Sequence, residues 1–302
     1  MNPRILAIIA AFSASFIYGV NHTIAKGLMP DVIQPYGFIL LRVSGAAIVF
    51  WIISLFYQRE KIAREDWGRL VLCAIFGMVI NMNMFFKGLE LSTPINSSVV
   101  ITLSPVLLLI LSALILSERI TLLKGIGITL GLGGALLLIL FGVKTQANAP
   151  NIPLGNLLFI VNATSYALYL IFVKKLVEKY SSITLMKFLF LIAFLINIPI
   201  GWSQFAAVEW ATLGFDEIWK LGFVVIGTTV LTYLFNIYAL KQLSPAVIGV
   251  FMYLQPLIAA AFAIITGSDQ LTTLRVIAAS LIFTGVYLAT RKKKVKRVAD
   301  GS

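Results

Sequence analysis

The sequence predicts an all-α integral membrane protein in which ten transmembrane helices form two inverted five-helix repeats, with both termini in the cytoplasm. Three observations predict this fold class: an apolar composition, ten apolar stretches of spanning length, and an internal repeat. Of the 302 residues, 60% are hydrophobic and 12% are charged, and the mean hydropathy is +0.97. The remaining polar side chains are too few to cover a soluble globule of this size.

The ten stretches are apolar over roughly 18 residues or more, the length at which an α-helix crosses the hydrocarbon layer. The first has no small-residue cleavage site, which favours a retained span over a signal peptide. Only Arg42 is a clear charge in the interior of a stretch. Arg275 lies close enough to an end of the last one for its side chain to snorkel. The predicted spans are 5–25, 36–57, 70–86, 94–116, 125–143, 154–173, 188–205, 221–240, 245–266 and 271–290.

An internal repeat relates residues 88–139 to residues 239–290, with a constant offset of 151 and no gap. Such a repeat indicates one structural unit built twice. Because the unit holds five spans, an odd number, the second copy enters the membrane from the opposite side. The predicted domains are a first repeat over 1–145, a second repeat over 150–290, and a basic cytoplasmic tail over 291–302.

The basic residues predict the orientation. With both termini inside, 18 Lys and Arg residues lie in cytoplasmic segments and five in outer segments, as the positive-inside rule requires. Six of the 18 follow the last span directly, where anionic headgroups attract them. The net charge of +12 is therefore explained by the lipid bilayer as a partner, and no nucleic acid is expected.

The first span carries a polar face. Ser15, Tyr18, His22 and Lys26 recur at spacings of three or four residues, with Asn21 beside them, so they share one side of a helix. A polar stripe facing lipid would be costly. We expect Tyr18, Asn21 and His22 to contact a substrate, although His22 and Lys26 are also close enough to the outer end to contact headgroups.

Arg42 lies in the second span, about six residues from its outer end. No Asp or Glu occurs inside any span to pair with it, and an unpaired buried charge is expensive. One interpretation is a snorkelling or carbonyl-bonded arginine. The other is a binding site for an anionic group of a substrate, such as a carboxylate.

Further polar residues occur in the third, sixth, eighth and ninth spans. Each is either an interhelical hydrogen-bonding residue, which contributes about 0.6 kcal/mol in a membrane, or a substrate contact. Together they predict a polar interior with aromatic walls. The candidates for substrate binding are Asn81, Asn83, Asn162, Tyr166, Thr232, Asn236, Tyr253 and Gln255.

Proline and glycine mark special backbone positions. Thr93-Pro94 predicts a helix start with a capping side chain. Pro105 and its repeat equivalent Pro256 lie near the middle of their spans, where each frees a backbone carbonyl, and so each forms either a fixed kink or a hinge. In the fifth span, Gly127 and Gly131 predict close helix packing.

The residue types that catalysis and metal binding require are nearly absent from the sequence. The chain has one cysteine and one histidine, with no zinc-binding His-Glu-x-x-His motif and no acid within a span. A metal centre or catalytic constellation therefore cannot be assembled. We expect no enzyme activity, no cofactor and no metal.

The chain resembles the EamA-type family of the drug/metabolite transporter superfamily over essentially its whole length. The resemblance implies ten helices in two inverted repeats around a central cavity, and the export of amino acids or related metabolites. It also implies structural roles for Glu118, Asp269, Pro105 and Pro256. The motifs that carry it are Leu89-Glu90-Leu91-Ser92-Thr93-Pro94, Leu103-Ser104-Pro105, Glu118-Arg119-Ile120-Thr121, Gly127, Gly134, Tyr18-Gly19 and Arg42.

These inferences predict a multi-pass transporter of the cell (inner) membrane, acting as a monomer or weak homodimer. Inverted repeats suit alternating access, because exchanging the conformations of the two halves turns the cavity from one side to the other. The expected substrate is an amino acid or related zwitterionic metabolite, moved outward. The alternative is a multidrug or toxic-compound exporter with an aromatic, less specific cavity.

Overall fold

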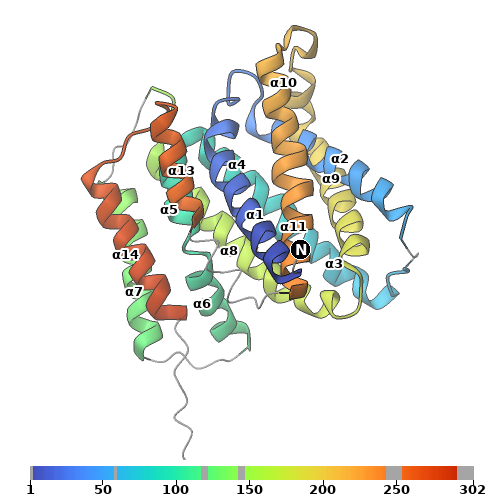
Figure 1. The fold of residues 1–302 in the computed structure, drawn as a ribbon, viewed down its shortest axis with the longest axis horizontal. Coiled ribbons are helices and arrows are strands. Elements are labelled where there is room, and N and C mark those ends of the chain that lie inside the picture. Colours follow the sequence, from blue (N-terminus) through green and yellow to red (C-terminus); the bar gives the residue numbers. More distant parts are fainter. Residues whose placement is uncertain (1–2, 58–59, 117–121, 142–146, 243–253, 291–302) are drawn as a thin grey trace, which may run out of the picture.

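The computed structural model describes residues 3–57, 60–116, 122–141, 147–242 and 254–290, and every element in these ranges is a helix (Figure 1). Six helical runs are long and apolar enough to cross a membrane. They coincide with six predicted spans, the first to third and the sixth to eighth. The runs are α1 (Pro3–Lys26), α2 (Pro35–Ser54), Arg64–Leu91, α8 (Ile152–Val177), α9 (Ser182–Ala206) and Phe215–Asn236.

The other four predicted spans are not among these six runs. The fourth is divided, and the first half of the ninth lies outside the described residues. The total of ten transmembrane helices therefore stays a prediction. The described helices in these four spans are α5 (Pro94–Ile101), α6 (Ser104–Leu116), α7 (Leu122–Phe141), α13 (Leu254–Ile265) and α14 (Thr273–Thr290).

The division of the fourth span has a local cause. α5 begins as predicted, because the Thr93 hydroxyl accepts a hydrogen bond from the backbone N–H of Asn96 at 3.3 Å. It ends at Ile101, four residues before Pro105, whose ring nitrogen cannot donate to the Ile101 carbonyl. The Ser104 hydroxyl donates to that carbonyl instead, at 2.7 Å. The freed carbonyl expected from the sequence is thus satisfied by a neighbouring side chain.

Two of the long runs contain π-helical segments. In the third span, η1 (Arg64–Asp66) and α3 (Trp67–Ala74) lead into the π segment η2 (Ile75–Ile80) and then α4 (Asn81–Leu91). In the eighth, α10 (Phe215–Gly222) is followed by the π segment η4 (Phe223–Leu231) and α11 (Thr232–Gln242). With the offset of 151, η2 falls on residues 226–231, within η4. A short 3₁₀ turn, η3 (Trp210–Thr212), precedes α10.

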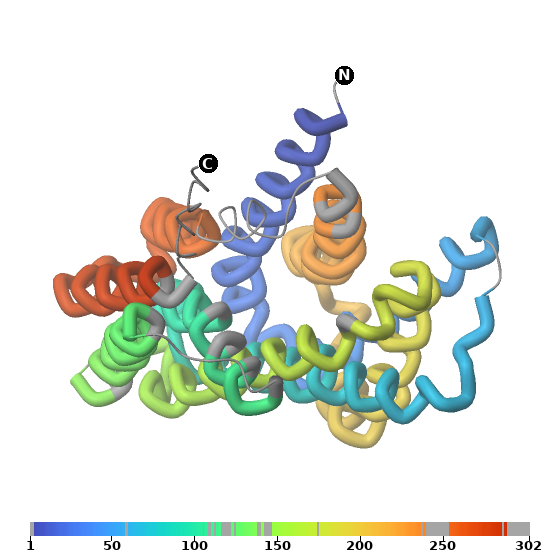
Figure 2. The backbone as a smooth tube through the Cα atoms, turned by 90° about the horizontal axis from the view of Figure 1, so that it is seen from below, coloured from blue at the N-terminus to red at the C-terminus, as the bar shows by residue number. Residues whose placement is uncertain are grey.

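Repeat-equivalent helices pack extensively on each other. α2 lies against α9, and α7 lies against α14, at opposite sides of the molecule (Figure 1). The α7–α14 approach confirms the predicted glycine packing, because a Cβ atom at Gly285 would lie 2.6 Å from the carbonyl oxygen of Gly127. Figure 2 shows α1 starting at the edge of the molecule and running towards its centre.

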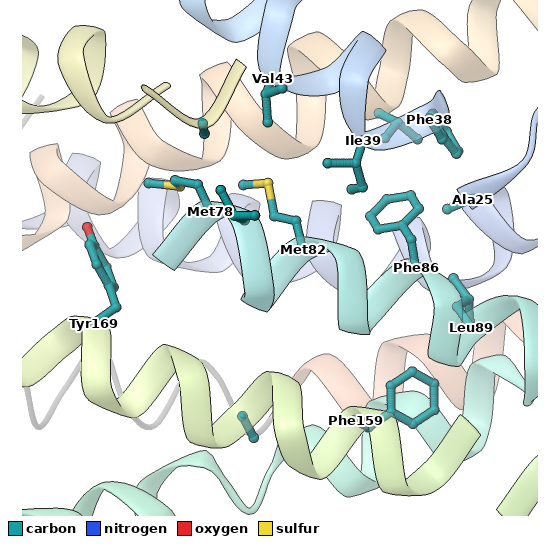
Figure 3. Packing of buried hydrophobic residues seen from close by; sticks show 14 of the residues in the cluster. Ala25, Phe38, Ile39, Val43, Met78, Met82, Phe86, Leu89, Phe159 and Tyr169 are labelled. Carbon is teal, nitrogen blue, oxygen red and sulfur yellow. The ribbon is translucent and has the colours of Figure 1, made fainter. Parts of the chain in front are cut away.

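A continuous apolar core joins the first half of the chain to α8. Phe86 of α4 points towards α2 and α1, with its ring edge-on to Phe38 at 5.0 Å between centroids (Figure 3). Large apolar side chains also cover the outside, among them Ile9, Phe12 and Phe16 of α1. An exposed apolar surface of this kind suits contact with lipid tails.

Arg275 does not snorkel, contrary to the sequence-based expectation. Its side chain is buried at the start of α14 and pairs with Asp269 at 2.7 Å. It also donates to Asn96 Oδ1 at 3.0 Å and to Thr93 Oγ1 at 3.1 Å, and Asp269 accepts from the backbone N–H of Ile95 at 3.3 Å. This pair therefore ties α14 to the first turn of α5, across the two predicted repeats.

Candidate functional site

A cavity of about 390 Å³ lies between the helices of the two predicted repeats. Its lining comes from α1, α2, α4, α8, α9, α11 and α13, and from the break between α5 and α6. Nine of the twelve candidate substrate-binding residues line it. They are Tyr18, Asn21, His22, Arg42, Asn81, Asn162, Tyr166, Asn236 and Gln255.

The other three candidates lie elsewhere. Asn83 is buried between α4 and α9, where its amide donates to Asn197 Oδ1 at 2.7 Å. Thr232 is fully buried behind the cavity wall, and its hydroxyl is hydrogen-bonded to the Tyr18 hydroxyl at 3.0 Å. Tyr253 is outside the described residues. For Asn83 and Thr232, the structure therefore favours the alternative of interhelical hydrogen bonding.

Arg42 is hydrogen-bonded to a carbonyl, as the first interpretation expects, and it also lines the cavity. Its Nε donates to Thr229 Oγ1 at 2.6 Å, and its Nη2 donates to the carbonyl of Thr228 at 3.2 Å. Both acceptors belong to the π segment η4, and such segments occur frequently at functional sites. The guanidinium also lies 5.6 Å from the ring centroid of Phe86. These contacts orient Arg42, which still lines the cavity.

The charge on the described cavity lining is of one sign only. Arg42 is its charged side chain, and no Asp or Glu occurs among the described residues that line it. Lys26 does not contribute, because its Nζ donates to the carbonyls of Leu89 at 2.8 Å and Glu90 at 2.6 Å. There it satisfies the end of α4, where a cation interacts favourably with the helix dipole. The described lining therefore carries one positive charge among neutral polar groups.

Symmetric hydrogen bonds hold the walls of the cavity. Asn81 and Asn162 each donate an amide N–H to the other's backbone carbonyl, at 3.2 and 2.7 Å, and so join α4 to α8. Tyr18 and Thr232 likewise join α1 to α11, across the two predicted repeats. Asn81 and Thr232 are repeat-equivalent, and each directly follows a π segment. The residue directly after each π segment thus makes an interhelical hydrogen bond.

Aromatic side chains form much of the remaining surface. Tyr18, Tyr166, Tyr169 and Tyr233 line the cavity together with Phe85, and the Tyr166 and Tyr169 rings lie 5.8 Å apart. Figure 3 shows Tyr169 extending from α8 towards the helix that carries Met78.

Several lining residues were not among the sequence-based candidates. The apolar ones give no sequence signal, because an apolar residue facing a cavity resembles one facing lipid. Phe85 is an exception, since it lies four residues after Asn81 and therefore on the same helix face. Ser104 could have been found from its position directly before Pro105. The missed lining residues include Met82, Phe85, Ile101, Ser104, Ser182 and Leu185.

The cavity extends towards one end of the bundle. Val177, which ends α8, and Ser182, which begins α9, both line it. At the opposite end, the buried contacts of Lys26 and Arg275 join α1 to α4 and α14 to α5. Polar contacts therefore close the helix bundle at one end, while the cavity reaches the other end. The described residues contain no cluster of His, Cys, Asp or Glu suited to a metal ion.

Comparison with known proteins gives a consistent result. The model of the EamA-like transporter family matches residues 5–140 and again residues 153–291. An uncharacterized transporter of Archaeoglobus fulgidus is 28% identical over 95% of this chain and 99% of its own. The uncharacterized transporter YyaM of Bacillus subtilis is 24% identical over 81% of both chains.

More distant similarity extends to plants and to solved structures. The WAT1-related protein At3g18200 of Arabidopsis thaliana is 19% identical over 98% of this chain and 84% of its own. The crystal structure of one protein has a sequence 18% identical to this chain. Its fold matches with a TM-score of 0.63 over 95% of this chain and 98% of that one. This last similarity shows a shared fold.

Proposed function

Because the chain belongs to the EamA-like transporter family, we propose that it exports a small carboxylate-bearing metabolite, an amino acid or related zwitterion, across the inner membrane. The observation that carries the proposal is Arg42, a buried guanidinium that lines the cavity without an acidic partner among its described neighbours. A substrate carboxylate would supply the missing negative charge and accept the guanidinium N–H groups left unused.

Alternating access is the proposed mechanism, with the predicted inverted repeats as its two halves. Repeat-equivalent pairs support this proposal, since α2 packs on α9 and α7 on α14, and the π segments occupy equivalent positions. With the termini in the cytoplasm, the cavity extends towards the cytoplasmic side, and the Lys26 and Arg275 contacts close the outer side. We further propose that the unit of transport is a monomer or weak homodimer without enzyme activity.

The test is transport by the purified protein in proteoliposomes loaded with single radiolabelled amino acids. Arg42→Gln, which keeps a hydrogen-bonding side chain but removes the charge, should reduce transport at least tenfold. Arg64→Gln is the matched control, because Arg64 is an exposed arginine at the start of η1. Unchanged transport by a normally folded Arg42→Gln protein would reject the carboxylate site.

The cavity tyrosines favour a second candidate, an exporter of organic cations, because aromatic faces attract cations. Arg42 opposes it, because like charges in a cavity of low dielectric repel strongly. Competition separates the two functions. Inhibition of amino acid transport by tetraphenylphosphonium at micromolar concentration would support the multidrug function, and indifference to it would support the metabolite function.

A further inference from the structure

We propose that His22, with Asn21 beside it, recognises the amino group of the zwitterionic substrate, and that Ser97 fixes His22 in the tautomer that makes this possible. The inference rests on the proposed function. It assigns residues to the amino group of the same substrate whose carboxylate Arg42 would bind. Arg42 has only donors and would bind the carboxylate. An amino group needs acceptors, and α1 supplies two of them.

The hydrogen bonds around Ser97 determine the tautomer. Ser97 Oγ donates to the carbonyl of Pro94 at 2.9 Å. A hydroxyl has a single proton and a carbonyl only accepts, so both contacts are hydrogen bonds at once only if Ser97 accepts from His22 Nδ1, which lies 2.6 Å away. In that arrangement Nδ1 of His22 carries the proton. In the neutral ring, Nε2 is then a bare acceptor.

The position of the ring leaves that acceptor for a ligand. Only 4% of His22 is exposed, and the ring is held edge-on to Phe85 at 5.5 Å between centroids. His22 lines the cavity, and its Nε2 makes no hydrogen bond within the described part of the chain. The ring is thus fixed at Nδ1 by the protein and left without a partner at Nε2.

Asn21 provides an independent observation. It lines the cavity, is 3% exposed, and its Oδ1 is buried without a hydrogen-bond partner among the described residues. Buried polar atoms normally find a partner, and an orphaned one in a cavity wall calls for an explanation. A bound ammonium group, towards which the Asn21 side chain turns its Oδ1, would supply this partner, because an ammonium offers three N–H donors to the acceptors of His22 and Asn21.

The resulting site discriminates by hydrogen bonding rather than by charge. No described acid lines the cavity, so an amino group is held by neutral acceptors while the carboxylate meets Arg42. A site built to bind an N–H group rejects the analogue that lacks it, because its buried acceptors stay unpaired. We therefore expect phenylalanine to be preferred over 3-phenylpropanoate, and leucine over 4-methylpentanoate, by at least about tenfold.

Nitrogen NMR tests the tautomer directly, because His22 is the only histidine in the chain. Protein labelled with ¹⁵N-histidine in lipid nanodiscs at neutral pH should show a protonated Nδ1 and an unprotonated Nε2. Ser97→Ala should abolish this preference. An Nε2–H tautomer or a cationic ring in the wild-type protein would overturn the proposal, whether or not amino acids are transported.

Two substitutions test the recognition step. His22→Asn keeps an N–H at the position of Nδ1 but removes the group at Nε2, whereas His22→Gln places a carboxamide near Nε2. The preference for phenylalanine over 3-phenylpropanoate should fall about tenfold in His22→Asn and be largely retained in His22→Gln. An unchanged preference in both variants overturns the role of His22, while the Arg42→Gln result judges the proposed function separately.

Discussion

At the scale of single residues, the pair Asp269–Arg275 shows how burial changes the contribution of a charged side chain to stability. The Asp269 side chain is fully buried and that of Arg275 is 6% exposed. Neighbouring polar groups on α5 satisfy both ends of the pair. Removing one partner from such a pair is costly because it leaves an uncompensated buried charge, whereas removing both is often tolerated.

Arg275→Met should therefore destabilise the folded protein by about 3–5 kcal/mol, read as a lower denaturation midpoint in SDS or on heating in detergent. The double variant Asp269→Asn/Arg275→Met should recover most of the loss. Lys220→Met is the control, because Lys220 pairs with Asp216 on an exposed surface, where ion pairs contribute little. A midpoint for Arg275→Met equal to that of the control would contradict the argument.

At the scale of elements, the break between α5 and α6 belongs to the cavity wall, since Ile101 and Ser104 both line the cavity. It replaces one backbone hydrogen bond with a side-chain one, from the Ser104 hydroxyl to the Ile101 carbonyl. A side-chain hydroxyl can exchange partners more readily than a backbone N–H inside a helix. The break therefore has the properties of a hinge as well as those of a fixed kink.

Pro105→Ala separates these alternatives. The substitution restores an N–H able to donate to the Ile101 carbonyl, so thermal stability should rise slightly. If the break is a hinge, transport should fall several-fold while substrate binding is retained. Transport at the wild-type rate in the stabilised variant would identify the break as a fixed kink.

Ser104→Ala gives the complementary prediction at the same break. It leaves the part-buried Ile101 carbonyl without its side-chain donor, and the loss of one such hydrogen bond costs about 0.5–1.5 kcal/mol. The denaturation midpoint should therefore fall. Ser280→Ala serves as the control, because the Ser280 hydroxyl donates to a helix carbonyl at an exposed position of α14.

At the scale of the whole molecule, the sequence allowed the apolar helices and much of the cavity to be predicted, because a polar residue inside an apolar stretch is conspicuous. Arg42 and His22 were found in this way. Arg275 was misjudged because, although its ion-pair partner Asp269 is only six residues away, the acceptors Thr93 and Asn96 on α5 lie far away in the chain. The π segments gave no signal, since inserting one residue into a turn leaves an apolar sequence apolar.

The cavity reaches one end of the helix bundle and not the other. This difference predicts which positions a reagent can modify from each side of the membrane. Ser182 lines the cavity next to the α8–α9 connection, whereas Ser92 is fully buried at the opposite end. The only native cysteine, Cys73, is buried. With the termini in the cytoplasm, a membrane-impermeant maleimide should label Ser182→Cys in inside-out vesicles and not in right-side-out ones. Ser92→Cys should be labelled in neither.

Labelling of Ser182→Cys from the outside alone would reverse the proposed orientation. Protection of Ser182→Cys by a transported amino acid would place that substrate in the cavity.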